Sequence, residues 1–143
     1  MAKTLQDTRI QLQRGEVTSE RLVAEALASA SSAEGQGDKV FIKVYEEQAM
    51  VQAKAIDQVR KSGVELHPLC GIPISIKDLF DVAGEITLSG SIVRKKSVPA
   101  NSDAHIVTKL RAAGAILIGR TNMTEFAFSG LGINPHYGTP LNP

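Results

Sequence analysis

Apolar residues in the first 63 positions recur at the three-to-four-residue spacing of amphipathic helices. Thr18 precedes one of these segments, where its hydroxyl can accept a hydrogen bond from the first helical turn. A glycine follows the first and the last segment, as is common after helices. The expected helices cover residues 4–14, 18–30 and 44–63. We expect residues 1–66 to form an N-terminal helical region in which the polar stretch 31–39 is a loop.

The pattern changes after residue 67. The run GIPISI at 71–76 is rich in β-branched residues and predicts a short strand. Its alternation places Ile72, Ile74 and Ile76 on one face and Pro73, Ser75 and Lys77 on the other. A helical pattern at 102–113 and a buried run, AILIG at 115–119, follow. The order strand, helix, strand predicts a right-handed βαβ unit. The fold class is therefore α/β, with helices packed on a partial mixed sheet.

Residues typical of helix ends mark where the later elements start and stop. Ser102 is the expected N-cap of the helix that ends at Gly114. Asn122 and Glu125 have the spacing of a capping box, which predicts a short helix directly after the second strand. Ligands of open α/β sheets bind at the carboxyl ends of the strands, so we expect the site there.

Composition excludes several function classes. The chain has 143 residues, 43% hydrophobic and 22% charged, which is the composition of one globular domain. A net charge of +1 and few aromatic residues argue against a nucleic-acid surface. One cysteine excludes an internal disulfide, and no apolar run is long enough to span a bilayer. We expect a soluble cytoplasmic protein, and the loop-like composition at 136–143 leaves open that it is a piece of something longer.

Lys77 is the first candidate for chemistry, because it lies where the first strand ends. Burial of a lysine lowers its pKa, and a neutral amine can act as a general base or as a Schiff-base nucleophile. The simpler interpretation is that Lys77 pairs with Asp78 or Asp81 and has no catalytic role. Composition alone favours the simpler interpretation.

Other polar residues give weaker signals. Asp78, Asp81 and Glu85 match no metal-binding loop, and three carboxylates near a turn are usually solvated. The three histidines lack the spacing of metal ligands, and Cys70 has no basic neighbour in the sequence that would activate it. A nucleotide-binding βαβ domain is disfavoured because its glycine fingerprint is absent. We therefore expect no metal site.

Two motifs, in order, carry a family resemblance. GIPISIKDLFDVAG is followed about forty residues later by GAILIGRTNMTEFAFSG and then by NPHYGTPLNP. Together they resemble the N-terminal part of the amidase signature family, over roughly residues 68–143. Members of that family hydrolyse carboxamides with a Ser, cis-Ser, Lys triad and need no cofactor. The resemblance implies the N-terminal part of the amidase signature fold, with 67–143 as the lysine-bearing α/β part of an amidase domain.

The resemblance assigns roles by position. Lys77 corresponds to the catalytic lysine, which takes a proton from the bridging serine, and this reverses the preference for the simpler interpretation. The stretch 123–130 corresponds to a lining of the acyl pocket. Its candidate substrate-binding residues are Phe126, Ala127, Phe128, Ser129 and Gly130. For either Phe taken singly, core packing is the simpler explanation.

The sequence departs from the family in one respect. The Gly/Ser-rich stretch with the bridging serine, and the nucleophilic serine after it, lie beyond the position of Pro143 in the family. Ser89 and Ser91 precede the place where that stretch belongs. We therefore expect the chain alone to be inactive and to expose apolar surface, with a second copy or the missing C-terminal part as the partner. The alternative is a non-catalytic module that binds a small amide or a partner chain.

Overall fold

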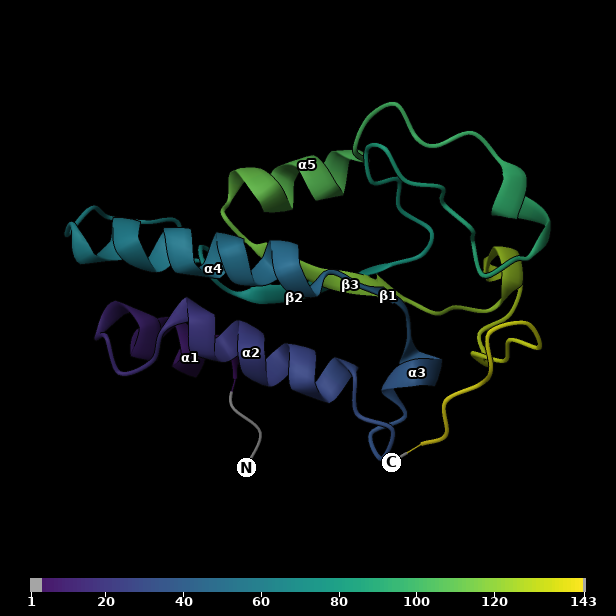
Figure 1. The fold of residues 1–143 in the computed structure, drawn as a ribbon, viewed down its shortest axis with the longest axis horizontal. Helices are drawn as coiled ribbons and strands as arrows, with labels where there is room; N and C mark the ends of the chain where they lie inside the picture. Colours follow the sequence, from purple (N-terminus) through teal and green to yellow (C-terminus); the bar gives the residue numbers. More distant parts are fainter. Residues whose placement is uncertain (1–3, 143) are drawn as a thin grey trace.

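The computed structural model describes residues 4–142 of the chain (Figure 1). The elements, in order, are α1 (Leu5–Gln13), α2 (Ser19–Ala30), α3 (Gly37–Val40), β1 (Phe41–Val44), α4 (Glu46–Lys61), β2 (Pro73–Lys77), the 3₁₀ helix η1 (Val93–Lys96), α5 (His105–Ala112), β3 (Ile116–Thr121) and the 3₁₀ helix η2 (Glu125–Ala127). The three helices expected before residue 66 are confirmed, with shifts of a few residues at their ends.

The first two helices begin at side-chain caps. The Thr4 hydroxyl accepts from the Asp7 backbone N–H, and the Asp7 carboxylate accepts from the Thr4 backbone N–H, which forms a capping box. Thr18 caps α2 as predicted, by accepting from the Arg21 N–H. A further cap comes from another helix, because Asp57 of α4 accepts from the backbone N–H groups of Ser19 and Glu20, both at 2.9 Å. Asp57 thereby ties α4 to the start of α2.

The sheet is mixed, as predicted. Its strand order is β1-β3-β2, with β2 parallel to β3 and β1 antiparallel to β3. The parallel pair confirms the strand-helix-strand unit. One expectation is wrong: the helix does not begin at Val44, which ends β1, and α4 starts only at Glu46. The short helix α3 lies partly within the expected loop.

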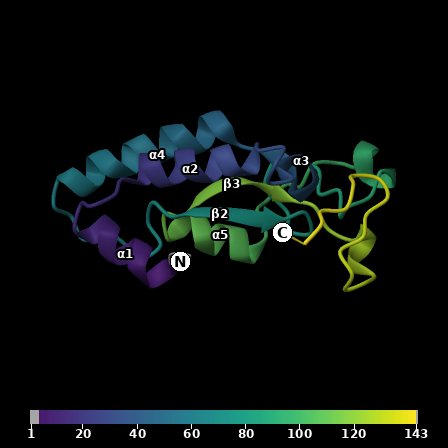
Figure 2. The ribbon, with the colours of Figure 1, turned by 90° about the horizontal axis from the view of Figure 1, so that it is seen from below.

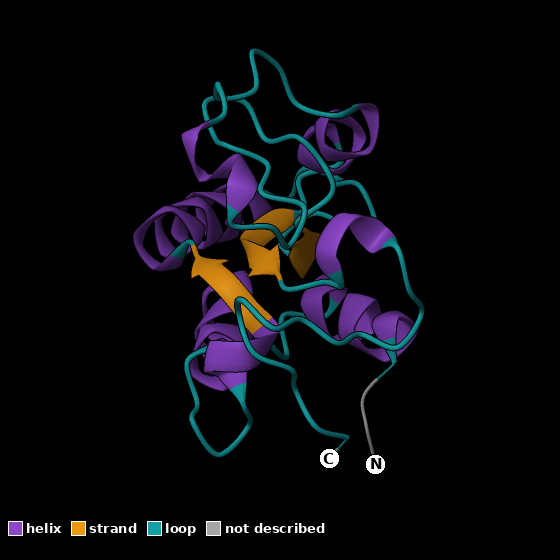
Figure 3. Cartoon of the chain, turned by 90° about the vertical axis from the view of Figure 1, so that its right-hand side faces the viewer, coloured by secondary structure: helices purple, strands orange, loops and turns teal. Residues whose placement is uncertain are grey.

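Helices cover both faces of the sheet, and successive residues of β3 divide between them. Ile116 and Ile118 pack with Val23 and Leu27 of α2 and with Ala49 and Ala53 of α4. Leu117, on the opposite face, packs with Ile76 of β2 and Val107 of α5. Figure 2 shows α2 and α4 on one side of the sheet and α5 on the other, and Figure 3 shows the strands enclosed between the helices. The alternation of one buried strand therefore defines two cores.

Beyond the carboxyl ends of β2 and β3 the chain forms long loops that lie side by side (Figures 1 and 2). Ser102 is not the N-cap of α5, because that helix begins after Ala104, whose side chain makes no cap.

Large apolar side chains are exposed in the last part of the chain. They are Phe126, Phe128, Leu131, Ile133 and Leu141. The expected exposed apolar surface is thus present in this segment.

Candidate active site

Lys77 is the last residue of β2, directly beside Thr121 of β3 in the parallel register. Its side chain is exposed, although Ile76 before it is buried, as the predicted alternation requires. Within residues 4–142, Lys77 forms no hydrogen bond or ion pair with another side chain. The pairing with Asp78 or Asp81 is therefore wrong. The expected burial is also wrong, because within residues 4–142 Lys77 is on the exposed side of β2, opposite to the buried Ile76.

Asp78 is fully buried, whereas Lys77 beside it is exposed. Its carboxylate accepts from Arg120 Nε at 3.0 Å, from the Gly90 N–H at 3.1 Å and from the Leu88 N–H at 3.3 Å. Its backbone N–H donates to the Thr121 carbonyl. The carboxylate thus has its own cation and its own backbone donors, which explains why it does not pair with the lysine.

Arg120 of β3 is 2% exposed, and it connects β3 to the chain segment that follows β2. Its Nη2 donates to the Phe80 carbonyl at 2.9 Å and to the Thr87 hydroxyl at 3.2 Å. Its Nη1 lies 3.5 Å from Glu85 Oε2. Asp78, Thr87, Arg120 and the turn 88–91 are called the polar junction below. Arg120 was not among the residues expected at the site; the parallel register places it opposite Ile76, one residue before Lys77.

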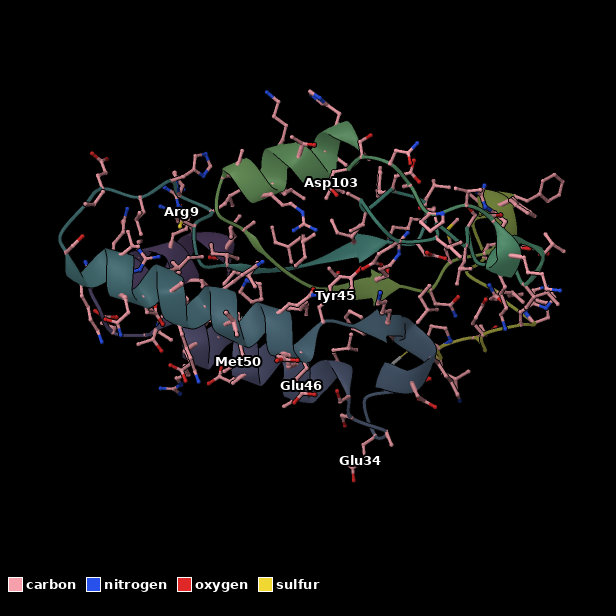
Figure 4. All side chains as sticks on the ribbon, turned by 45° about the horizontal axis from the view of Figure 1, so that its top comes forward. Arg9, Glu34, Tyr45, Glu46, Met50 and Asp103 are labelled. Atoms are coloured by element: carbon pink, nitrogen blue, oxygen red, sulfur yellow. The ribbon has the colours of Figure 1, made fainter. Side chains whose placement is uncertain are left out.

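Glu85 extends the polar junction toward β1 and α4. It accepts a hydrogen bond from the Tyr45 hydroxyl at 2.8 Å and pairs with Lys43 Nζ at 3.0 Å. Burial, followed by the hydrogen bond to Glu85, raises the pKa of the Tyr45 phenol well above its usual range. Figure 4 shows Tyr45 lying near the middle of the molecule, close to the strands. A pocket of about 430 Å³ opens here, and Lys43, Glu85, Leu88, Pro99 and Arg120 are among its lining residues.

The turn 88–91 has a constrained backbone. Ser89 has a φ of 55°, which is uncommon outside glycine, and Gly90 has a φ of 67°. A Cβ on Gly90 would lie 2.6 Å from the Met123 carbonyl oxygen, so only glycine fits. The buried Asn134 donates from Nδ2 to the carbonyls of both Gly90 and Met123, at 2.8 and 2.7 Å. The turn is therefore held against the stretch that follows β3.

Ser91 ends this turn in a second set of contacts. Its buried hydroxyl donates to Glu125 Oε1 at 2.6 Å and accepts from the Val93 N–H. His136 Nε2 lies 3.4 Å from the same carboxylate oxygen. The carboxylate, not the imidazole, stands in the middle, so the three residues lack the arrangement of a Ser-His-acid triad. They connect turn 88–91, η2 and the NPHYG segment.

The predicted pocket residues lie along η2 and just after it. All five, Phe126, Ala127, Phe128, Ser129 and Gly130, are exposed, and Phe128 is 94% exposed. The Phe126 N–H donates to the Ser89 carbonyl, which places the start of this stretch beside the turn that Asp78 holds. Their role as an acyl pocket stays a prediction, and so does that of Lys77.

The expected capping box before η2 is wrong. Thr124 precedes the helix, and it makes no side-chain cap. The Asn122 side chain instead donates to the carbonyls of Lys39 and Gly138, at 3.0 and 2.8 Å. Those two carbonyls come from segments distant in the sequence. The local spacing of Asn122 and Glu125 therefore could not reveal that Asn122 binds them instead of capping η2.

The other candidate residues are placed as follows. Cys70 has a basic neighbour after all, since Arg60 donates to its carbonyl at 2.8 Å, yet burial raises the pKa of its thiol. Over residues 4–142, no three His, Cys, Asp or Glu side chains gather in a way that could hold a metal ion. None of the helices in that same part of the chain is long and apolar enough to cross a membrane.

Known proteins resemble this chain in both sequence and fold. The chain is 40% identical over 129 residues to AtzE, the 1-carboxybiuret hydrolase subunit of Pseudomonas sp. (strain ADP), covering 90% of this chain and 28% of that protein. It is 38% identical over 133 residues to one of the subunits of the glutamyl-tRNA(Gln) amidotransferase of Rhodopirellula baltica, covering 93% and 26%. The chain thus spans little more than a quarter of these relatives.

The fold comparison agrees. A solved chain from a vestigial protein complex, described as revealing the origins of an s-triazine catabolic enzyme, aligns with a TM-score of 0.87 at 37% identity, over 95% of this chain and 30% of that one. The family model described as Amidase matches residues 21–143. The chain therefore belongs to the amidase signature family and corresponds to the N-terminal part of its longer members.

Proposed function

We propose that the protein carrying this chain hydrolyses the carbon–nitrogen bond of small carboxamides through a serine acyl-enzyme, with Lys77 as the general base. The observation that carries the proposal is that Lys77, at the end of β2, is exposed and unpaired within the described residues. Its neighbour Asp78 is already paired with Arg120, and within the described residues Lys77 has no counter-ion. A lysine whose Nζ is not held by a carboxylate can contact a serine hydroxyl, which is the position that a general base needs.

The chemistry then proceeds in two halves. Neutral Lys77 Nζ takes a proton from a bridging serine, which takes one from the nucleophilic serine as its oxygen attacks the amide carbon. The amine leaves with a proton, and water hydrolyses the resulting ester. Both serines and the oxyanion donors are supplied by residues outside these 143. The chain alone is therefore proposed to be inactive, and desolvation of Lys77 to come from the same outside residues.

The substrate and partner follow from the relatives only in outline. Both are named as subunits, one of a hydrolase and one of an amidotransferase. We propose a small amide for the acyl pocket that begins at Phe126. The remainder of the polypeptide, or a partner chain, then covers the exposed apolar side chains after η2.

The test is the Lys77→Ala variant in the full-length protein. We expect turnover of primary amides, measured as ammonia release, to fall by at least about 1,000-fold while circular dichroism stays unchanged, because a missing triad residue removes the proton acceptor. Lys109→Ala is the matched control, since Lys109 is an exposed lysine on α5. Retained turnover in Lys77→Ala would refute the general-base role. An inactive wild type that still binds the amide would favour the non-catalytic module.

A further inference from the structure

The general-base proposal uses Lys77 but leaves the buried ion pair beside it without a role. Asp78 and Arg120 are both almost fully buried. Burying two charges costs desolvation free energy, so such a pair is weak evidence for stability and is better explained by a need for a defined arrangement. We propose that Asp78 and Arg120 are positioning residues that fix Lys77 relative to turn 88–91 and stretch 123–130. This inference rests on the proposed function of Lys77.

The backbone around Asp78 shows how the lysine is fixed. The Asp78 N–H donates to the Thr121 carbonyl, and the Asp78 carbonyl accepts from the Ser89 N–H. One residue therefore joins the end of β2 both to β3 and to the turn. The Asp78 side chain adds the bonds from Leu88 and Gly90 described above, so the residue directly after Lys77 has almost no freedom to rotate.

Arg120 holds this arrangement from the other strand. Three separate acceptors, on Asp78, Phe80 and Thr87, receive its N–H groups. They come from the segment that leaves β2, so the guanidinium fixes the path of the chain just after Lys77. A guanidinium presents its donors in a rigid fork, which a flexible lysine ammonium cannot reproduce.

Two hydrogen bonds carry the arrangement on to the predicted acyl pocket. The Ser89 carbonyl accepts from the Phe126 N–H at 2.8 Å, and the Gly90 carbonyl accepts from Asn134 Nδ2. Lys77 and the pocket stretch thus share one buried support. A displacement of about 1 Å between a base and a bound substrate can lower a rate by about 100-fold.

The experiment is Asp78→Asn in the full-length protein, with Asp57→Asn as the matched control. Both aspartates are buried and accept from two backbone N–H groups, but Asp57 lies between α2 and α4. Asparagine keeps the size of the side chain and loses one acceptor oxygen. The readouts are ammonia release from benzamide, labelling of the serine nucleophile by a fluorophosphonate, and the melting temperature.

We expect Asp78→Asn to lower kcat and the labelling rate about 100-fold at temperatures well below its melting point, with KM within about threefold of wild type. Asp57→Asn should lower the melting temperature and leave kcat unchanged. Equal kcat values for the two variants would overturn the positioning role. So would a loss in Asp78→Asn that disappears on cooling, because a stability effect alone behaves in that way.

A second variant covers the case in which Asp78→Asn does not fold. Arg120→Lys keeps the buried positive charge but cannot bond to Asp78, Phe80 and Thr87 together. We expect its kcat to fall about tenfold with little change in KM, and an unchanged kcat would overturn the inference.

Lys77→Ala separates the two proposals: if that variant stays active, the proposed function fails. If it is inactive while Asp78→Asn matches wild type, only the positioning inference fails.

Discussion

The two ends of the sheet are held together by different physical means. At the helical end, α2 and α4 pack on one face of β3 mainly through apolar side chains, with Val23, Ala49 and Ile116 at zero exposure. At the other end, the polar junction holds loops together through buried charges and backbone hydrogen bonds. Apolar contacts tolerate small shifts, whereas hydrogen bonds fix direction. The helical end therefore supplies stability, and the loop end supplies geometry where the chemistry is proposed.

The largest expected stability effect tests the helical end. Ile116→Ala removes a fully buried side chain between α2 and α4, and we expect the free energy of unfolding to fall by about 2 to 5 kcal/mol. Urea denaturation followed by circular dichroism measures it. Val51→Ala, an exposed position on α4, should change stability by less than about 0.5 kcal/mol. A small effect at Ile116 would mean that this core carries less of the stability than the contrast requires.

The next effect tests the loop end. Asn134→Ala leaves the buried carbonyls of Gly90 and Met123 without their donor, and the N–H groups of His136 and Tyr137 without their acceptor. We expect a loss of about 1 to 3 kcal/mol, since unsatisfied buried polar groups are costly. Faster amide hydrogen exchange should be confined to the loops around these residues, with Asn101→Ala, at an exposed position, as control. Exchange that also quickened in α2 would show that the two ends are not separate.

The same contrast explains what the sequence could predict. Periodicity located α2, α4 and the parallel strands, because their side chains are sorted by simple burial. Periodicity also placed Lys77 at the end of a strand, but it did not predict that the Lys77 side chain is exposed. The strand β1 was missed, because it is only four residues long and its last residue, Val44, was assigned to the following helix.

The loop end was beyond such reasoning because its contacts join residues far apart in the chain. Arg120 and Asp78 are 42 positions apart, so no local pattern marks them as a pair. The Asn122–Glu125 spacing even gave a wrong helix cap, because Asn122 donates to carbonyls of Lys39 and Gly138 instead. The predicted roles of Lys77 and of stretch 126–130 came from the family resemblance carried by GIPISIKDLFDVAG and GAILIGRTNMTEFAFSG, and they stay predictions.

The smallest expected effect lies at the border of the two ends, at Tyr45. Burial and the hydrogen bond to Glu85 raise the pKa of its phenol above the usual value near 10. A raised folded-state pKa stabilises the fold fully below the unfolded value, and that contribution is lost as pH rises above about 10. Tyr45→Phe removes the bond to Glu85 and should cost about 0.5 to 1.5 kcal/mol at neutral pH.

The ionisation itself can be assigned cleanly because the sequence has only two tyrosines. In the 143-residue chain carrying Tyr137→Phe, the phenol of Tyr45 is the only one left, and its ultraviolet difference absorbance should show no ionisation until the pH is well above 10. The signal should then appear together with unfolding, because the buried hydroxyl can release its proton into water only when the fold opens. Titration at the usual pH with the fold intact would mean that Tyr45 is open to solvent. The hydrogen bond between Tyr45 and Glu85 would then be a solvent-exposed contact, and Tyr45 would not be part of the buried contacts that extend from the polar junction.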